Sequence, residues 1–207
     1  MTRLALCDVS GPLTDLFQKL SGEDGEQWLR ALNKMLRKEN PWEAFPTWKT
    51  IKLGTGPKTA DDFRKSLALA ASGNRVSDWA NDLLGKPEFA NSVSEKEVEV
   101  DLVVLTTAQL TSKANGGTTA EVFAGAERLG LKKCSAEVGP RLRLQYQDQP
   151  LGEWLLIGME PIRHSDGRLG VFDVGRGDDG RWLGGDYGDP GGVWAAGDQW
   201  VFVRPRK

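Results

Sequence analysis

The residues best suited to chemistry gather in the last third of the chain, where aspartates recur beside glycines. Carboxylates on glycine-rich backbone are ligands that Ca²⁺ prefers. Their spacing, however, fits neither an EF-hand loop nor a nonapeptide calcium repeat, and tight turns also require aspartate next to glycine. The pattern therefore predicts turns, and we expect no bound metal. The aspartates in this stretch are Asp166, Asp173, Asp178, Asp179, Asp186, Asp189 and Asp198.

Aromatic residues accompany these aspartates in RWLGGDYGDPGGVW, residues 181–194. If its tryptophans are exposed beside the aspartates, they form a platform that stacks sugars, bases or peptide side chains. If they fold under the loop, they form a small core that covers a sheet. Both interpretations stay open, and the second is favoured. The candidate binding residues here are Trp182, Asp186, Tyr187 and Trp194.

Arginine alternates with leucine in RLRLQYQ, residues 141–147, and this period of two predicts a strand. Arg141 and Arg143 then share one face with two glutamines. That face is either a solvated outer surface or a positive strip that binds an acidic or polar partner. Nucleic acid is a less favoured partner, because a net charge of −2 gives the whole molecule no attraction to it.

Catalytic residue types are otherwise scarce. His164 is the single histidine, and we expect it to be exposed because it precedes a predicted hairpin turn. One histidine and two distant cysteines, Cys7 and Cys134, cannot form an ordinary closed zinc site. Two carboxylates held across a cleft could hydrolyse a glycosidic bond. The candidate carboxylates are Glu137, Glu153, Glu160 and Asp173.

Neither a cofactor nor a membrane is indicated. The glycines and lysine before a predicted helix at 59–71 lack the spacing of a phosphate-binding loop, so we expect no cofactor. No stretch approaches the roughly 18 apolar residues of a membrane span. The start, MTRLALCDVSG, is too short in apolar residues for a signal peptide. We expect a cytoplasmic protein in which both cysteines are free thiols.

The texture of the chain changes near its middle, which predicts an α+β protein. Apolar residues recur at helical spacing in region 1–90, whereas region 98–207 reads as a mainly antiparallel sheet with one helix at 118–129. The segment 86–97 is a candidate linker, and the two regions are either separate or one integrated domain. The last strand, QWVFVR, is apolar on both faces, which predicts that Trp200 and Phe202 lie in the core.

Three stretches carry a resemblance: LSGEDGEQWLRALNKMLRKENPW, VSDWANDLLGKP and EVGPRLRLQYQDQPLGEWLLIGMEPI. Together with the tryptophan-rich ending, they resemble a recurrent family of uncharacterised bacterial proteins. The resemblance implies that these pieces belong to one unit and that the origin is bacterial and cytoplasmic. It implies no activity, so no site residues are carried over from it.

The function that these observations favour is binding rather than catalysis. The hypothesis is a non-catalytic interaction protein that uses the loops rich in Trp, Asp and Gly, together with the Arg/Gln strand, to bind a protein or a polar ligand. The first alternative is a carboxylate-dependent hydrolase. The second is a nucleic-acid-binding protein that uses Arg141 and Arg143.

Overall fold

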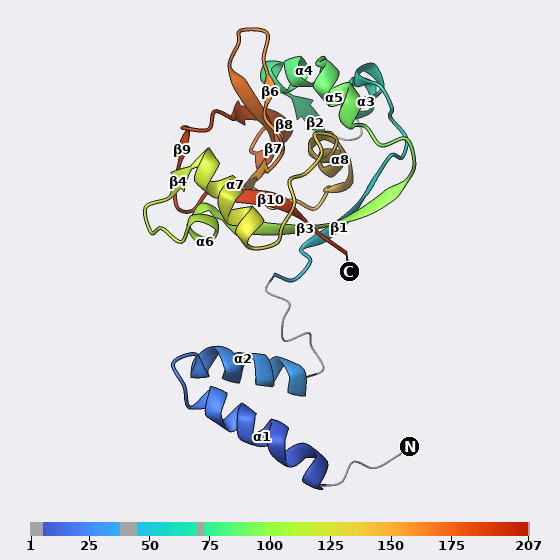
Figure 1. The fold of residues 1–207 in the computed structure, drawn as a ribbon. Coiled ribbons are helices and arrows are strands. Elements are labelled where there is room, and N and C mark those ends of the chain that lie inside the picture. The colour runs from blue at the N-terminus through green and yellow to red at the C-terminus, as the bar shows by residue number, and fades with distance from the viewer. Residues whose placement is uncertain (1–5, 38–44, 70–72, 207) are drawn as a thin grey trace. The chain divides into compact units, whose positions relative to one another are not determined.

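The computed structural model describes residues 6–37, 45–69 and 73–206, and Figure 1 shows their helices and strands. By their internal contacts the residues form two compact units, 1–46 and 47–207, which we describe separately. The helices between residues 60 and 92 therefore belong to the same unit as the sheet, and the boundary lies well before the candidate linker.

The first unit is a helical hairpin. Helix α1 spans Leu6–Leu20 and contacts α2, which spans Gly25–Leu36. An ion pair joins Lys19 to Asp15 one turn earlier at 3.0 Å, and the Lys19 ammonium also lies 4.4 Å from the centre of the Trp28 ring. Both helices follow the helical spacing of apolar residues seen in the sequence.

The second unit is built on one large sheet. Its strand order is β1-β3-β10-β5-β7-β8-β2, with β6 paired to β7 at one side. Neighbouring strands pair antiparallel except for β10 with β5 and β2 with β8, which are parallel. The strands are β1 (Lys49–Leu53), β2 (Asn74–Val76), β3 (Val98–Thr106), β5 (Trp154–Ile157), β6 (Ile162–Arg163), β7 (Leu169–Gly177), β8 (Gly180–Tyr187) and β10 (Gln199–Arg204).

Helices pack on both faces of this sheet. On one face lie α3 (Ala60–Leu67), α4 (Asp78–Leu84), α5 (Pro87–Ser92) and α8 (Val138–Gln145). Phe172 of β7 points to this side and stacks edge-to-face on Phe89 of α5, with ring centres 5.9 Å apart. On the other face, Phe123 of α7 (Thr119–Arg128) packs on Trp200 at 5.9 Å. Helix α6 (Thr107–Thr111) and the short pair β4 (Gly117–Thr118) and β9 (Val193–Trp194) flank α7.

Several expectations are confirmed. The fold mixes helices with a large, mainly antiparallel sheet. The helix expected at 118–129 is α7, and the structure adds that Thr118 caps it and exchanges hydrogen bonds with Glu121, as in a capping box. Trp200 and Phe202 are both fully buried. Cys134 is a buried free thiol, while the Cys7 side chain lies outside the described residues. Among the described helices, none combines the length and the hydropathy needed to cross a membrane.

Other expectations are wrong or hold only in part. Helix α5 occupies the segment expected to be a linker, and it buries Phe89 in the core. The segment expected to be an arginine-bearing strand is instead helix α8, in which Arg141 and Arg143 are 2% and 0% exposed. The order of helices first and sheet second holds in part, because β1 and β2 come from the first half of the chain.

Candidate functional site

One face of the sheet is open where β5, β7 and β8 run side by side. In their register Trp154 lies opposite Gly175, and Gly175 lies opposite Trp182, so both indoles share a face. Asp173, two residues before Gly175 in β7, pairs with Gly184 and lies on the same face. Trp200 also belongs to this face, but α7 covers it. The open part is therefore a hollow on the surface of the sheet, over these three strands.

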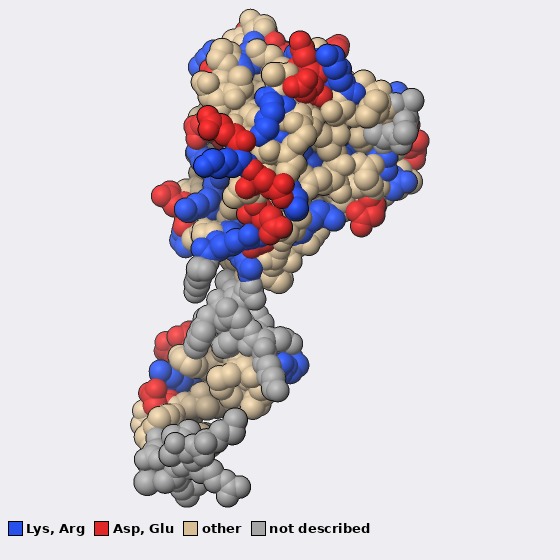
Figure 2. All heavy atoms as spheres, turned by 90° about the vertical axis from the view of Figure 1, so that its right-hand side faces the viewer, with Lys and Arg blue, Asp and Glu red and all other residues tan. Residues whose placement is uncertain are grey.

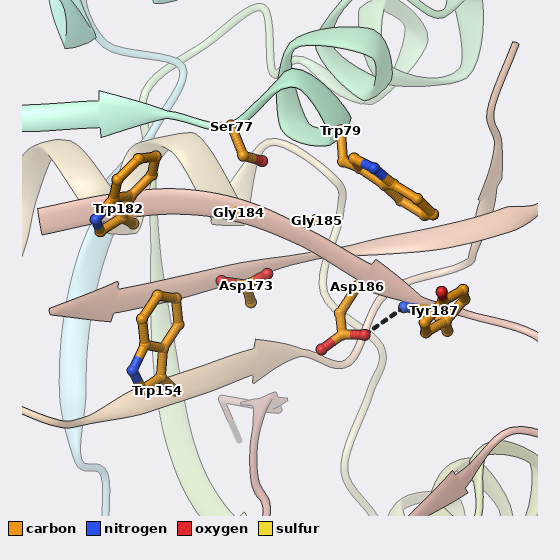
Figure 3. Close-up of a pocket in the computed structure, with 9 residues that line it drawn as sticks. All are labelled: Ser77, Trp79, Trp154, Asp173, Trp182, Gly184, Gly185, Asp186 and Tyr187. Carbon is orange, nitrogen blue, oxygen red and sulfur yellow. Dashed lines mark hydrogen bonds between the residues drawn. The ribbon is translucent and has the colours of Figure 1, made fainter. Parts of the chain in front are cut away.

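Three adjoining cavities occupy this hollow, and we call them together the aromatic–acidic groove. Their volumes are about 330, 330 and 450 Å³, and Asp186 lines all three. Figure 3 shows the first cavity, in which Asp173 lies on the strand between those that carry Trp182 and Trp154. The aromatic and acidic residues that line this first cavity are Trp79, Trp154, Asp173, Trp182, Asp186 and Tyr187.

Two glycines make room for the side chains of the groove. The Trp154 ring lies against Gly175, where any Cβ would collide with it. The Asp173 carboxylate lies over Gly184 in the same way. Glycine inside a strand marks such a close approach. The sequence of β7 and β8 is thus adapted to bring an indole and a carboxylate down onto the sheet.

The aromatic walls are held by contacts on their outer sides. The Trp182 Nε1–H donates to Asp179 Oδ1 at 2.9 Å, and the Arg75 guanidinium lies 5.5 Å from the Trp182 ring. The Arg168 guanidinium lies 4.2 Å from the ring of Trp79. Trp79 in turn packs edge-to-face on Tyr187, with centres 5.5 Å apart. These contacts orient the rings before any ligand is present.

Asp173 is the unusual group of the site. Its residue is 8% exposed, and its buried Oδ1 has no hydrogen-bond partner among the described residues. Burial, reinforced by the nearby charge of Asp186, raises the pKa of Asp173 from 3.8 to about 7. Asp186 itself accepts a hydrogen bond from the Tyr187 backbone N–H at 2.7 Å. Near neutral pH, Asp173 can therefore exist with or without its proton.

The charge of the groove has one sign. The described residues that line the three cavities include four aspartates and no lysine, arginine or histidine. The face of the 47–207 unit in Figure 2 differs, because positive and negative side chains are interspersed over it.

The structure brings three of the predicted binding residues together. Trp182, Asp186 and Tyr187 line the same cavity, and Tyr187 is 49% exposed. Trp194 lines the other two cavities. Its Nε1–H donates to Thr119 Oγ1 at 2.8 Å and its ring packs on Trp200 at 5.0 Å. Trp194 therefore joins the covered core to the groove, while Trp182 is half-buried and lines the first cavity.

Arg141 and Arg143 do not form the expected exposed strip. Arg141 Nε donates to Glu137 Oε1 at 2.7 Å, and its other nitrogens donate to backbone carbonyls, one of them that of Pro57 at 2.6 Å. Arg143 donates to Gln149 Oε1 at 2.5 Å and to the Gly175 carbonyl at 3.2 Å. Both guanidinium groups fasten α8 to its surroundings, so they offer no surface to nucleic acid.

The remaining candidates have structural partners. His164 is 6% exposed rather than solvated, and its Nδ1 lies 3.0 Å from Asp82 Oδ2. Glu153 accepts from the Tyr146 hydroxyl at 2.8 Å, and Glu160 pairs with Lys133 at 2.5 Å. Of the four candidate carboxylates, Asp173 alone lines the groove.

Sequence reasoning missed two walls of the groove, Trp79 and Trp154. Trp79 stands in an apolar stripe of α4 and Trp154 begins a strand, and both patterns are typical of core residues. The usable signal was glycine within a strand pattern at 175 and 184, which indicates that another group approaches the backbone there.

Among the described residues, no group of three or more His, Cys, Asp or Glu side chains is placed to hold a metal ion. Comparison of the chain with models of known protein families, with curated proteins and with solved structures found no match. The resemblance to a bacterial family stays a prediction.

Proposed function

We propose that the 47–207 unit is a non-catalytic binding module and that the aromatic–acidic groove is its ligand site. The observation that carries the proposal is the Asp173 carboxylate, which lines the groove beside two indoles, is nearly buried and has an Oδ1 without a partner among the described residues. A buried polar group without a partner costs free energy. A ligand that supplies the missing partner recovers this cost on binding.

The walls support the same proposal. Trp154 is 49% exposed and Tyr187 is 49% exposed, although both are large aromatic residues. Aromatic side chains at the floor and rim of a cleft supply much of the contact energy in ligand and protein binding. Outer contacts orient Trp182, Trp79 and Tyr187, which lowers the entropy lost when a ligand is bound.

Titration calorimetry with three probes tests this proposal: choline, Nα-acetyl-lysine amide and cellobiose. We expect at least one probe to bind the full chain and to lose most of its affinity in the Trp154→Ala variant. Leu151→Ala is the matched control, because Leu151 is 62% exposed and does not line the groove. Absence of binding by all three probes, or binding that Trp154→Ala leaves unchanged, overturns the proposal.

A second candidate function is a carboxylate-dependent hydrolase. It is favoured by the raised pKa of Asp173, about 7, because burial and the neighbouring Asp186 create an acid that can donate a proton near neutral pH. In this candidate Asp173 is the general acid and Asp186 is the second carboxylate of the pair. A panel of 4-nitrophenyl glycosides tests it: turnover should fall above pH 7 and vanish in Asp173→Asn. Turnover that survives this variant contradicts the assignment.

A further inference from the structure

The charge balance of the groove points to the chemical class of its ligand. Asp173 and Asp186 line the first cavity, and Asp189 and Asp198 line the adjoining ones. An acidic cluster on its own carries little information, since surface carboxylates are solvated. Here one of them, Asp173, is 8% exposed and its Oδ1 has no partner among the described residues. The site therefore lacks a donor or a positive charge that a ligand would bring.

The nearby arginines are engaged elsewhere. Arg75 lies over the Trp182 ring and pairs with Asp179 at 3.5 Å. Arg168 lies over the Trp79 ring and pairs with Asp166 at 2.5 Å. Across the sheet, Arg143 donates to the Gly175 carbonyl from the opposite face. None of these three guanidinium groups lines the cavities around Asp173.

The aromatic walls of the groove, like its negative charge, favour a cationic ligand. An ammonium group over the face of an indole is attracted by the ring quadrupole, and the attraction grows when water is excluded. Trp154 and Trp182 come from the two strands that flank the strand of Asp173, and Trp79 lies farther along the same cavity (Figure 3). A neutral sugar would use the indoles but would leave an ionised Asp173 buried without a counter-charge.

We propose that the groove binds an alkylammonium group, held by Asp173 and Asp186 against the faces of Trp154 and Trp182. This inference rests on the proposed binding function and adds the charge of the ligand to it. Cavities of about 330 Å³ hold a group of this size.

Choline and its uncharged isostere 3,3-dimethylbutan-1-ol separate charge from shape. By calorimetry at pH 8, we expect choline to bind the full chain at least tenfold more tightly than the isostere. Asp173→Asn should remove most of this preference by weakening the binding of choline. Asp148→Asn is the matched control, because Asp148 is an exposed aspartate outside the groove, with a side chain 81% exposed. It should behave as the wild type.

The pH dependence gives a second readout that needs no variant. Choline favours ionised Asp173, and burial together with Asp186 raises the pKa of Asp173 to about 7. At pH 6 most Asp173 carries a proton, so the affinity should be about tenfold weaker than at pH 8. The affinity of the isostere should not change over this range.

The possible failures are distinguishable. If the isostere or cellobiose binds as tightly as choline and depends on Trp154, the cationic inference is overturned while the binding function stands. If choline and Nα-acetyl-lysine amide both fail to bind, the inference is overturned as well. If no probe shows Trp154-dependent binding, both the inference and the proposed function fail.

Discussion

The two faces of the sheet differ in whether a buried carboxylate has hydrogen-bond partners. On the α8 side, Glu137 is fully buried and accepts hydrogen bonds from Gly54 N–H at 2.9 Å, Ser94 N–H at 2.8 Å and Arg141. On the groove side, Asp173 is nearly as buried, yet its Oδ1 has no partner among the described residues. Burial of a carboxylate therefore does not by itself indicate function. What distinguishes the two sites is whether the chain completes the set of partners.

The pKa values follow the same contrast. Burial opposes the ionisation of Glu137, but the hydrogen bonds from Ser94, Gly54 and Arg141 outweigh it and hold the pKa of Glu137 below its usual range. At Asp173 burial acts with little opposition, and the charge of Asp186 adds to it. Glu137 is a fixed charge of the fold, whereas Asp173 titrates near neutral pH.

The largest expected effect is at the completed site. Glu137→Gln leaves the Arg141 guanidinium, 2% exposed, without its counter-charge. Breaking a buried ion pair from one side costs about 3–5 kcal/mol. Denaturation with urea should show a loss of this size, whereas Glu160→Gln, at an exposed pair, should change stability by less than about 0.5 kcal/mol. Equal stability of the two variants would break the comparison between the faces.

The opposite sign is expected at the incomplete site. The pKa of Asp173 in the folded state, about 7, lies above its ordinary value of 3.8, so its contribution to stability is fully present below pH 4 and is lost as the pH rises to 7. Asp173→Asn removes this dependence. The free energy of unfolding of the variant minus that of the wild type should therefore be up to about 4 kcal/mol larger at pH 8 than at pH 4. Unfolding curves of both proteins at both pH values measure this difference. A difference that is smaller at pH 8 than at pH 4 would contradict the prediction.

The smallest stability effect is expected where glycine makes room in the groove. Gly175→Ala places a methyl group against the Trp154 ring, which must move. Because Trp154 is 49% exposed it can swing outward, so we expect a loss of about 1–2 kcal/mol together with loss of Trp154-dependent binding. Gly191→Ala is the control, since no atom lies within 4 Å of the added carbon. Unchanged probe binding in Gly175→Ala would separate this glycine from the groove.

Local signals in the sequence correctly predicted local structure. The capped helix α7 was recognisable because Thr118 and Glu121 interact within one turn. The turn DDGR forms the β7–β8 hairpin, in which Gly177 pairs with Gly180. The buried position of Trp200 and Phe202 followed from a strand that is apolar on both faces. In the first two cases the interacting residues are close in the chain, and in the third the apolar pattern of one strand was sufficient, so no distant partner had to be known.

Residue types and their alternation along β5, β7 and β8 belong to the sequence, including the carboxylate of Asp173 and the glycines at 175 and 184. Only the tertiary structure decided that α8 is a helix, because its arginines are stabilised by acceptors such as the Pro57 carbonyl, far away in the chain. The tertiary structure also decided which residues line the groove. Alternation tells which residues share a face of one strand, but not which strands are neighbours or in what register. That pairing is what brings Trp154, Trp182 and Asp173 together on one face of three neighbouring strands.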